Sequence, residues 1–150
     1  MGAAKTKRPT GGEAEYLERA IGRYSREVAA IARAALKKMR TQFPGAWLLV
    51  YDRRQSLPIG IAAANKSALF SIVLYTRWVR FFFLEGVLLE DPERRLEGDG
   101  NQVRSIRLDE GAAVLNDPYI RGLVAQAIKE AGVDLKKGRG QIVLKSTIEG

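Results

Sequence analysis

Apolar residues in the first third of the chain recur every three or four positions, from Leu17 to Met39. This period places them on one face of a helix, so the pattern predicts a long helix over Glu13–Gln42. Pro44 ends this helix, because the residue before a proline is pushed out of helical backbone angles. The face opposite the apolar residues carries recurring arginine and lysine side chains.

Short apolar segments separated by turn-forming residues follow the predicted helix. Segments of this length, with continuous or alternating apolar character, are typical of strands. We predict strands over Trp47–Tyr51, Pro58–Ala62, Leu69–Tyr75, Trp78–Leu84 and Val103–Leu108, and a short edge strand over Gln141–Lys145.

The two most apolar of these segments are separated only by Thr76 and Arg77, which predicts a hairpin. Both faces of Trp78–Leu84 are largely apolar, so we expect this strand to be central and covered on both sides. Pro58 lacks a backbone N–H, which favours an edge position or a strand start for the strand that contains it.

A second helix is predicted near the C-terminal end of the chain. Asp117 is a good N-cap and Pro118 suits the first helical position, whereas Gly132 suits the C-terminal stop. The order of one helix, several strands and a second helix predicts an α+β fold. Because the connections between strands are short, we expect a mainly antiparallel sheet of about five strands.

The length of 150 residues fits one domain. Residues 1–12 are small, basic and turn-forming, and we expect them to form a disordered tail. The remaining chain, residues 13–150, is then a single α+β domain.

Cysteine and histidine are absent, and the net charge is +8. Their absence excludes thiolate nucleophiles, zinc–thiolate sites and a histidine general base. The positive charge attracts polyanions in general. No apolar leader or membrane-length apolar segment is visible, so we expect a cytoplasmic protein without a membrane partner.

Five motifs occur in a fixed order along residues 13–146, and together they resemble the YdhG-like family of small bacterial domains of unknown function. The motifs are Phe43–Ala46, Trp78–Gly86, Asp91-Pro92 with Leu96–Gly100, Arg104–Arg107 with Asp117-Pro118, and Gln141–Ser146.

The resemblance implies helices packed on a curved antiparallel sheet, and it implies little about activity. Some members of the family are described as frataxin-like iron chaperones. Such a role uses a dense acidic surface, whereas this chain is basic. The family loop commonly carries a lysine where this chain has Asn101, which argues against anion binding by that loop.

Aromatic and arginine side chains on the predicted strands form a first candidate site. Tyrosine and tryptophan each have a polar end suited to a ligand, and the arginine fork suits carboxylates and phosphates. The alternative is that the aromatic residues belong to the core and that the arginines pair with surface carboxylates. The candidate ligand-binding residues are Tyr51, Tyr75, Arg77, Trp78, Arg80 and Arg104.

Basic residues on the first predicted helix form a second candidate site. A stripe at helical spacing is suited to a phosphate backbone. The alternative is an ordinary solvated helix face. The candidate polyanion-binding residues are Arg19, Arg23, Arg26, Arg33, Lys37 and Arg40.

The sequence therefore leaves three functional hypotheses open. The first is a non-enzymatic binding module for a small molecule or a protein, with its site on the sheet. The second is binding of nucleic acid or an acidic partner through the first helix, and the third is the iron-chaperone role that the resemblance suggests. No catalytic or metal-binding pattern stands out, so we expect no cofactor and no enzyme activity.

Overall fold

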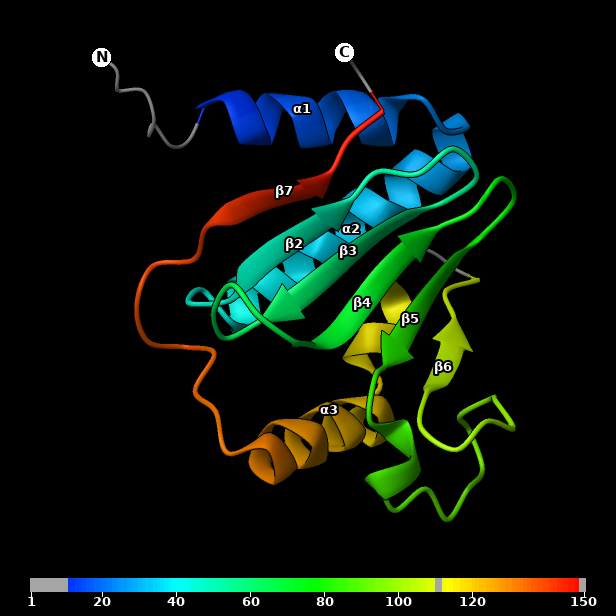
Figure 1. The fold of residues 1–150 in the computed structure, drawn as a ribbon. Coiled ribbons are helices and arrows are strands. Elements are labelled where there is room, and N and C mark those ends of the chain that lie inside the picture. The colour runs from blue at the N-terminus through cyan, green and yellow to red at the C-terminus, as the bar shows by residue number, and fades with distance from the viewer. Residues whose placement is uncertain (1–10, 110–111, 149–150) are drawn as a thin grey trace.

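The computed structural model describes residues 11–109 and 112–148 (Figure 1). Its helices are α1 (Gly11–Gly22), α2 (Arg26–Gln42) and α3 (Pro118–Ala131), with short 3-10 turns η1 (Gly86–Leu88) and η2 (Ala113–Asn116). Its strands are β2 (Trp47–Tyr51), β3 (Leu57–Ala62), β4 (Ala68–Leu74), β5 (Val79–Phe83), β6 (Arg104–Arg107) and β7 (Ile142–Ser146).

The strands form one sheet in the order β6-β5-β4-β3-β2-β7. Strands β2 to β6 are successive antiparallel neighbours, whereas β7 pairs in parallel with β2. The α+β class and the edge position of β7 are confirmed. The sheet has six strands where about five were expected. Four of its five strand pairings are antiparallel, as predicted, and the parallel pairing of β7 with β2 makes the sheet mixed, because the chain crosses by way of α3 before it joins the other edge.

The predicted hairpin is formed by β4 and β5, with Leu74 opposite Val79 and the Tyr75 N–H donating to the Trp78 carbonyl at 2.8 Å. The prediction that this second strand is covered on both sides is wrong. Strand β5 is next to the edge strand β6, and Arg80 and Phe82 are only half-buried. The sheet is covered by helices on one face, so the other face of β5 stays accessible.

Strand β3 lies inside the sheet between β2 and β4, which corrects the edge position suggested by Pro58. The pairing of β3 with β2 ends at Ile59, opposite Val50, so Pro58 lies one residue beyond it. Pro58 still pairs with Val73 of β4. The proline is tolerated because it lies near the start of β3, where the strand has no backbone hydrogen bonds to β2 that a missing N–H would interrupt.

The single long helix predicted over Glu13–Gln42 is two helices. Helix α1 ends at Gly22, and Ser25 caps α2 by accepting a hydrogen bond from the Val28 N–H at 3.1 Å. A straight helix of this length is about 45 Å long, whereas strands of five to seven residues span roughly 17–23 Å. The break lets both apolar faces pack on the short sheet.

Helix α1 begins at Gly11, inside the segment expected to be a tail, and residues 1–10 lie outside the described residues. The predicted caps of α3 are confirmed. The Asp117 side chain accepts from the Tyr119 N–H, Pro118 is the first helical residue, and Gly132 has a positive φ of 66°.

The core lies between the helices and one face of the sheet. Its centre contains Phe70, Phe81 and Phe83, whose ring centroids are 5.2–5.7 Å apart. Leu49 and Val73 are also buried but stand apart from this core, on the opposite face of the sheet. No helix covers that opposite face among the described elements (Figure 1).

Candidate functional site

The aromatic members of the first candidate site gather at one end of the sheet. Tyr51 ends β2, Tyr75 follows β4 and Trp78 precedes β5. Each alternates with a core residue, so each belongs to the face away from the helices. Trp78 is 39% exposed, and the two tyrosines are half-buried. The phenylalanines of the same strands belong to the core instead, apart from the half-buried Phe82.

The arginines of the first candidate site do not converge there. The Arg80 guanidinium donates to Ser105 Oγ at 3.1 Å and pairs with Glu97 at 2.5 Å. Arg104 donates to the carbonyls of Gly100 and Val103 at 2.7 and 2.8 Å. It shares the sheet face of Ile106, which is the core face, whereas the aromatic residues lie on the other face.

Two arginines outside the predicted set reach the aromatic group. The Arg53 guanidinium carbon lies 5.5 Å from the centre of the Tyr51 ring. The Arg107 guanidinium carbon lies 4.6 Å from the centre of the Trp78 ring, and the Arg107 Nε pairs with Asp109 at 2.5 Å.

The position of Arg107 opposite Arg80 on the neighbouring strand places it at this sheet end, and that register is not visible in the sequence. Arg77 is exposed in the hairpin turn. Of the arginines at this sheet end, Arg80 and Arg107 are therefore each paired with a carboxylate.

The break between α1 and α2 divides the second candidate site. Arg19 lies on α1, with its guanidinium carbon 5.6 Å from the centre of the Tyr16 ring. Arg23 lies in the break and forms an ion pair with Asp52, and Arg26 is the first residue of α2. These three arginines do not line the groove that contains the other predicted residues.

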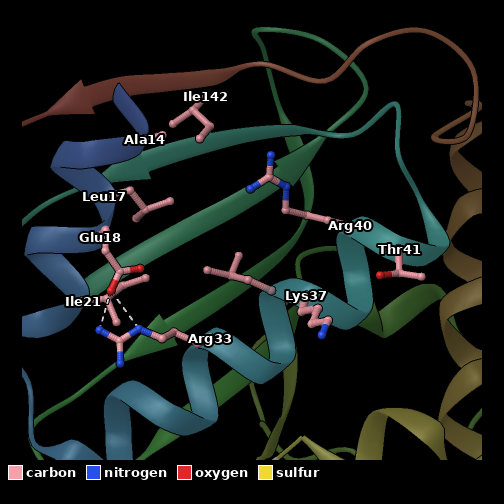
Figure 2. Close-up of a pocket in the computed structure, with 10 residues that line it drawn as sticks. Ala14, Leu17, Glu18, Ile21, Arg33, Lys37, Arg40, Thr41 and Ile142 are labelled. Carbon is pink, nitrogen blue, oxygen red and sulfur yellow. Dashed lines mark hydrogen bonds and ion pairs between the residues drawn. The ribbon is translucent and has the colours of Figure 1, made fainter. Parts of the chain in front are cut away.

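Arg33, Lys37 and Arg40 line a groove of about 560 Å³ between α1 and α2 (Figure 2). All three are exposed, and they lie on the outer side of α2. The Arg33 Nε donates to a carboxylate oxygen of Glu18, on α1, at 2.8 Å. Apolar side chains complete the groove, namely Leu17 and Ile21 of α1, Leu36 of α2 and Ile142 of β7.

A second basic groove of about 650 Å³ lies between the end of α2 and α3. Its charged lining residues are Arg121, Lys129 and Lys136, with no carboxylate among the described residues that line it. The sequence pattern did not indicate this groove, although Arg121 and Lys129 both lie in the predicted second helix. The groove brings together segments far apart in the chain, and no periodic pattern reports that contact.

Both basic grooves reach the C-terminal end of α2, since Thr41 lines the first groove and Gln42 the second. Six cations line the two grooves together. Among them only Arg33 has a carboxylate within ion-pair distance, counting the residues that the structure describes. We call this region the basic helical surface, and its cations are Arg33, Lys37, Arg40, Arg121, Lys129 and Lys136.

Acidic side chains do not assemble into a metal site in the described part of the chain, because no three carboxylates there are close enough to hold one ion. Over the same residues, no helix is long and apolar enough to cross a membrane.

Comparison with known proteins gave no match to a family model, to a curated protein or to a solved structure. The resemblance to the YdhG-like family therefore stays a prediction. What is established at this point is an α+β protein with a six-stranded mixed sheet, helices on one face and a basic surface over those helices.

Proposed function

We propose that this chain is a non-enzymatic binding protein whose basic helical surface contacts the phosphate backbone of a nucleic acid. One observation carries the proposal. Five of the six cations of that surface have no carboxylate within ion-pair distance among the described residues. Unpaired cations at a surface are accompanied by mobile counterions, and a polyanion that replaces those ions gains free energy from their release.

The arrangement of these cations supports a partner with repeated charges. They come from α2, from α3 and from the segment after α3, on both sides of the C-terminal end of α2. A single small anion contacts only one such cluster, whereas a phosphate backbone presents charges over the whole distance. The net charge of +8 adds long-range attraction for any polyanion.

The hypothesis of a ligand site on the sheet is supported less well. An anionic ligand at Trp78 competes with Glu97 for Arg80 and with Asp109 for Arg107. The aromatic residues at this sheet end remain suited to a neutral ligand, and this role stays a prediction. The iron-chaperone hypothesis requires clustered carboxylates, and the described residues form no such cluster.

Charge reversal of two cations tests the proposed function. The variant Lys37→Glu/Arg40→Glu places two negative charges in the first groove. We expect it to weaken binding of a fluorescently labelled oligonucleotide by about tenfold or more in low salt, because it turns attraction to phosphate into repulsion. Binding is measured by fluorescence anisotropy, with both single-stranded and duplex oligonucleotides.

The matched control is Lys66→Glu/Arg77→Glu, which changes the net charge by the same amount at exposed positions in loops of the sheet. The proposal requires this control to retain most of the affinity. An equal loss in both variants would show that net charge alone drives binding. Tight binding of polyglutamate with no binding of either oligonucleotide would instead make an acidic protein the partner.

A further inference from the structure

A small cavity of about 250 Å³ lies between the sheet, η1 and the last turns of α3. Figure 1 shows η1 beside α3, below the ends of β4 and β5. The cavity walls are apolar and include Leu69 and Phe83 of the sheet, Leu89, and Ala127 of α3. Phe83 is fully buried, so the cavity reaches the edge of the core.

Among the described residues, the charged side chains that line this cavity are two glutamates, Glu85 from the end of β5 and Glu130 from α3. A Glu85 carboxylate oxygen accepts from Gln102 Nε2 at 2.6 Å. Neither glutamate has a lysine or arginine within ion-pair distance in the part of the chain that is described. The cavity is therefore an acidic site in a protein whose net charge is +8.

Exposed apolar side chains surround the same place. Leu88 lines the cavity and is 57% exposed, and Val87 beside it is 45% exposed. Both belong to η1, and they are among the few large apolar side chains that the described surface presents to water. A ligand that carries hydrocarbon to this position removes apolar area from water.

We propose that this cavity binds a small aliphatic ammonium ion, with its hydrocarbon chain against the apolar walls and its charged nitrogen between Glu85 and Glu130. The two carboxylates supply the charge complementarity and exclude anions. The volume is below the usual range for larger ligands, which limits the occupant to a short chain. This site is separate from the basic helical surface and does not depend on the proposed function.

Hexylammonium, hexanol and hexanoate are matched probes for this site, because they share a chain and differ in charge. We expect hexylammonium to bind most tightly and hexanoate not to bind, with shifted NMR methyl signals for Leu88, Leu89 and Ala127. Across shorter alkylammonium ions the affinity is expected to fall by about fourfold for each methylene removed. Equal affinity for hexylammonium and hexanol would overturn the role of the carboxylates.

Variants separate recognition of the charge from filling of the cavity. Glu130→Gln is expected to weaken hexylammonium binding by about twofold to fivefold and to leave hexanol binding unchanged. Glu27→Gln, which removes the same charge from the exposed surface of α2, is the matched control and is expected to have no effect. Loss of hexylammonium affinity in both variants would contradict the proposal.

Filling the cavity is the second arm of the test. Ala127→Leu is expected to abolish binding of hexylammonium and hexanol alike, and Ala131→Leu, at an exposed position on the same wall, serves if the first variant does not fold. Unchanged binding in a folded variant would place the probes elsewhere. The variant Lys37→Glu/Arg40→Glu is expected to keep hexylammonium affinity, so failure of the nucleic-acid proposal and failure of this one are distinguishable.

Discussion

Asp52 is the most unusual single residue in the structure, because its charged side chain is almost completely buried. The residue is 2% exposed, accepts a hydrogen bond from the Tyr16 hydroxyl at 2.6 Å and pairs with Arg23. Its other oxygen, Oδ1, has no hydrogen-bond partner among the described residues. Burial, followed by the charge of Asp52, also raises the pKa of the neighbouring Tyr24 hydroxyl, against the opposing effect of Arg23.

The ion pair between Arg23 and Asp52 predicts an asymmetry between two variants. Arg23→Met leaves a carboxylate buried with less compensation, whereas Asp52→Asn leaves an arginine whose side chain is already 36% exposed. We expect Arg23→Met to lower the free energy of unfolding by about 2–3 kcal/mol, less than for a fully buried pair, and Asp52→Asn to lower it by about 1 kcal/mol. Urea denaturation near neutral pH measures both, and the reverse order would contradict this account of the break.

Asp91 and Asp117 both accept hydrogen bonds from Tyr119 and Arg95, and these bonds predict that the stability of the fold decreases at acidic pH. Burial raises the pKa of the Asp91 carboxyl. Hydrogen bonds from the Tyr119 hydroxyl and from the backbone N–H groups of Leu96 and Arg95 outweigh this effect and hold the pKa below its ordinary value of 3.8. The backbone N–H of Tyr119, followed by the Arg95 side chain, lowers the pKa of Asp117 in the same way.

A carboxyl whose pKa is lowered by folding stabilises the protein fully above its unfolded pKa. That contribution is lost as the pH falls below 3.8 and through the lower folded pKa. We therefore expect the free energy of unfolding to decrease as the pH falls below about 4, and Asp91→Asn or Tyr119→Phe to flatten this decrease. Urea denaturation at a series of pH values measures the slope, and identical slopes in the variants and the parent protein would refute the assignment.

At the scale of elements, two glycines hold the segment after α3 against the start of β2. A Cβ on Gly45 would lie 1.9 Å from the Lys137 carbonyl oxygen, and a Cβ on Gly140 would lie 2.0 Å from the Ala46 carbonyl oxygen. The Gly45 N–H also donates to the Leu135 carbonyl at 2.8 Å. This close backbone approach leads the chain to the edge of the sheet, where β7 pairs with β2.

These contacts predict opposite effects for two glycine-to-alanine substitutions. Gly45→Ala forces backbone to move and is expected to lower the free energy of unfolding by about 1–3 kcal/mol. Gly122→Ala, in α3 with no atom within 4 Å of the added Cβ, is expected to raise it by about 0.5–1 kcal/mol. Chemical denaturation compares the two, and a neutral Gly45→Ala would show that the approach is not tight.

Local signals predicted most elements, and contacts between distant segments supplied the rest. The caps at Asp117 and Gly132 and the hairpin at Thr76 and Arg77 follow from residues next to each other in the chain. The break at Ser25 also has a local signal, a glycine followed by a capping residue, but the apolar period continues through it and outweighs that signal.

The parallel pairing of β7 and the second basic groove had no such signal. The partner of β7 is about a hundred residues away in the chain, and strand periodicity says nothing about which edge a strand joins. Likewise, only half of the predicted polyanion-binding stripe lines one groove, namely Arg33, Lys37 and Arg40. Helix α3 adds cations to the other groove, and only the tertiary structure brings them near.

At the scale of the whole molecule, the surface charge is divided between regions. Most of the cations over α2 and α3 have no carboxylate within ion-pair distance among the described residues, whereas Arg80 and Arg107 at the open sheet face are paired with Glu97 and Asp109. The small cavity beside η1 carries two carboxylates. A net charge of +8 alone explains general attraction of polyanions. This uneven distribution of charge explains why the basic helical surface, rather than the open sheet face, is expected to bind a polyanion.

The salt dependence of oligonucleotide binding tests the central claim most directly. If the six cations of the basic helical surface contact phosphates, a plot of log affinity against log salt concentration has a slope of about −5 for a duplex and about −4 for a single strand. Lys37→Ala/Arg40→Ala is then expected to reduce the slope by about 2 in magnitude. A slope near zero, or a slope that the double variant leaves unchanged, would contradict binding of nucleic acid through this surface.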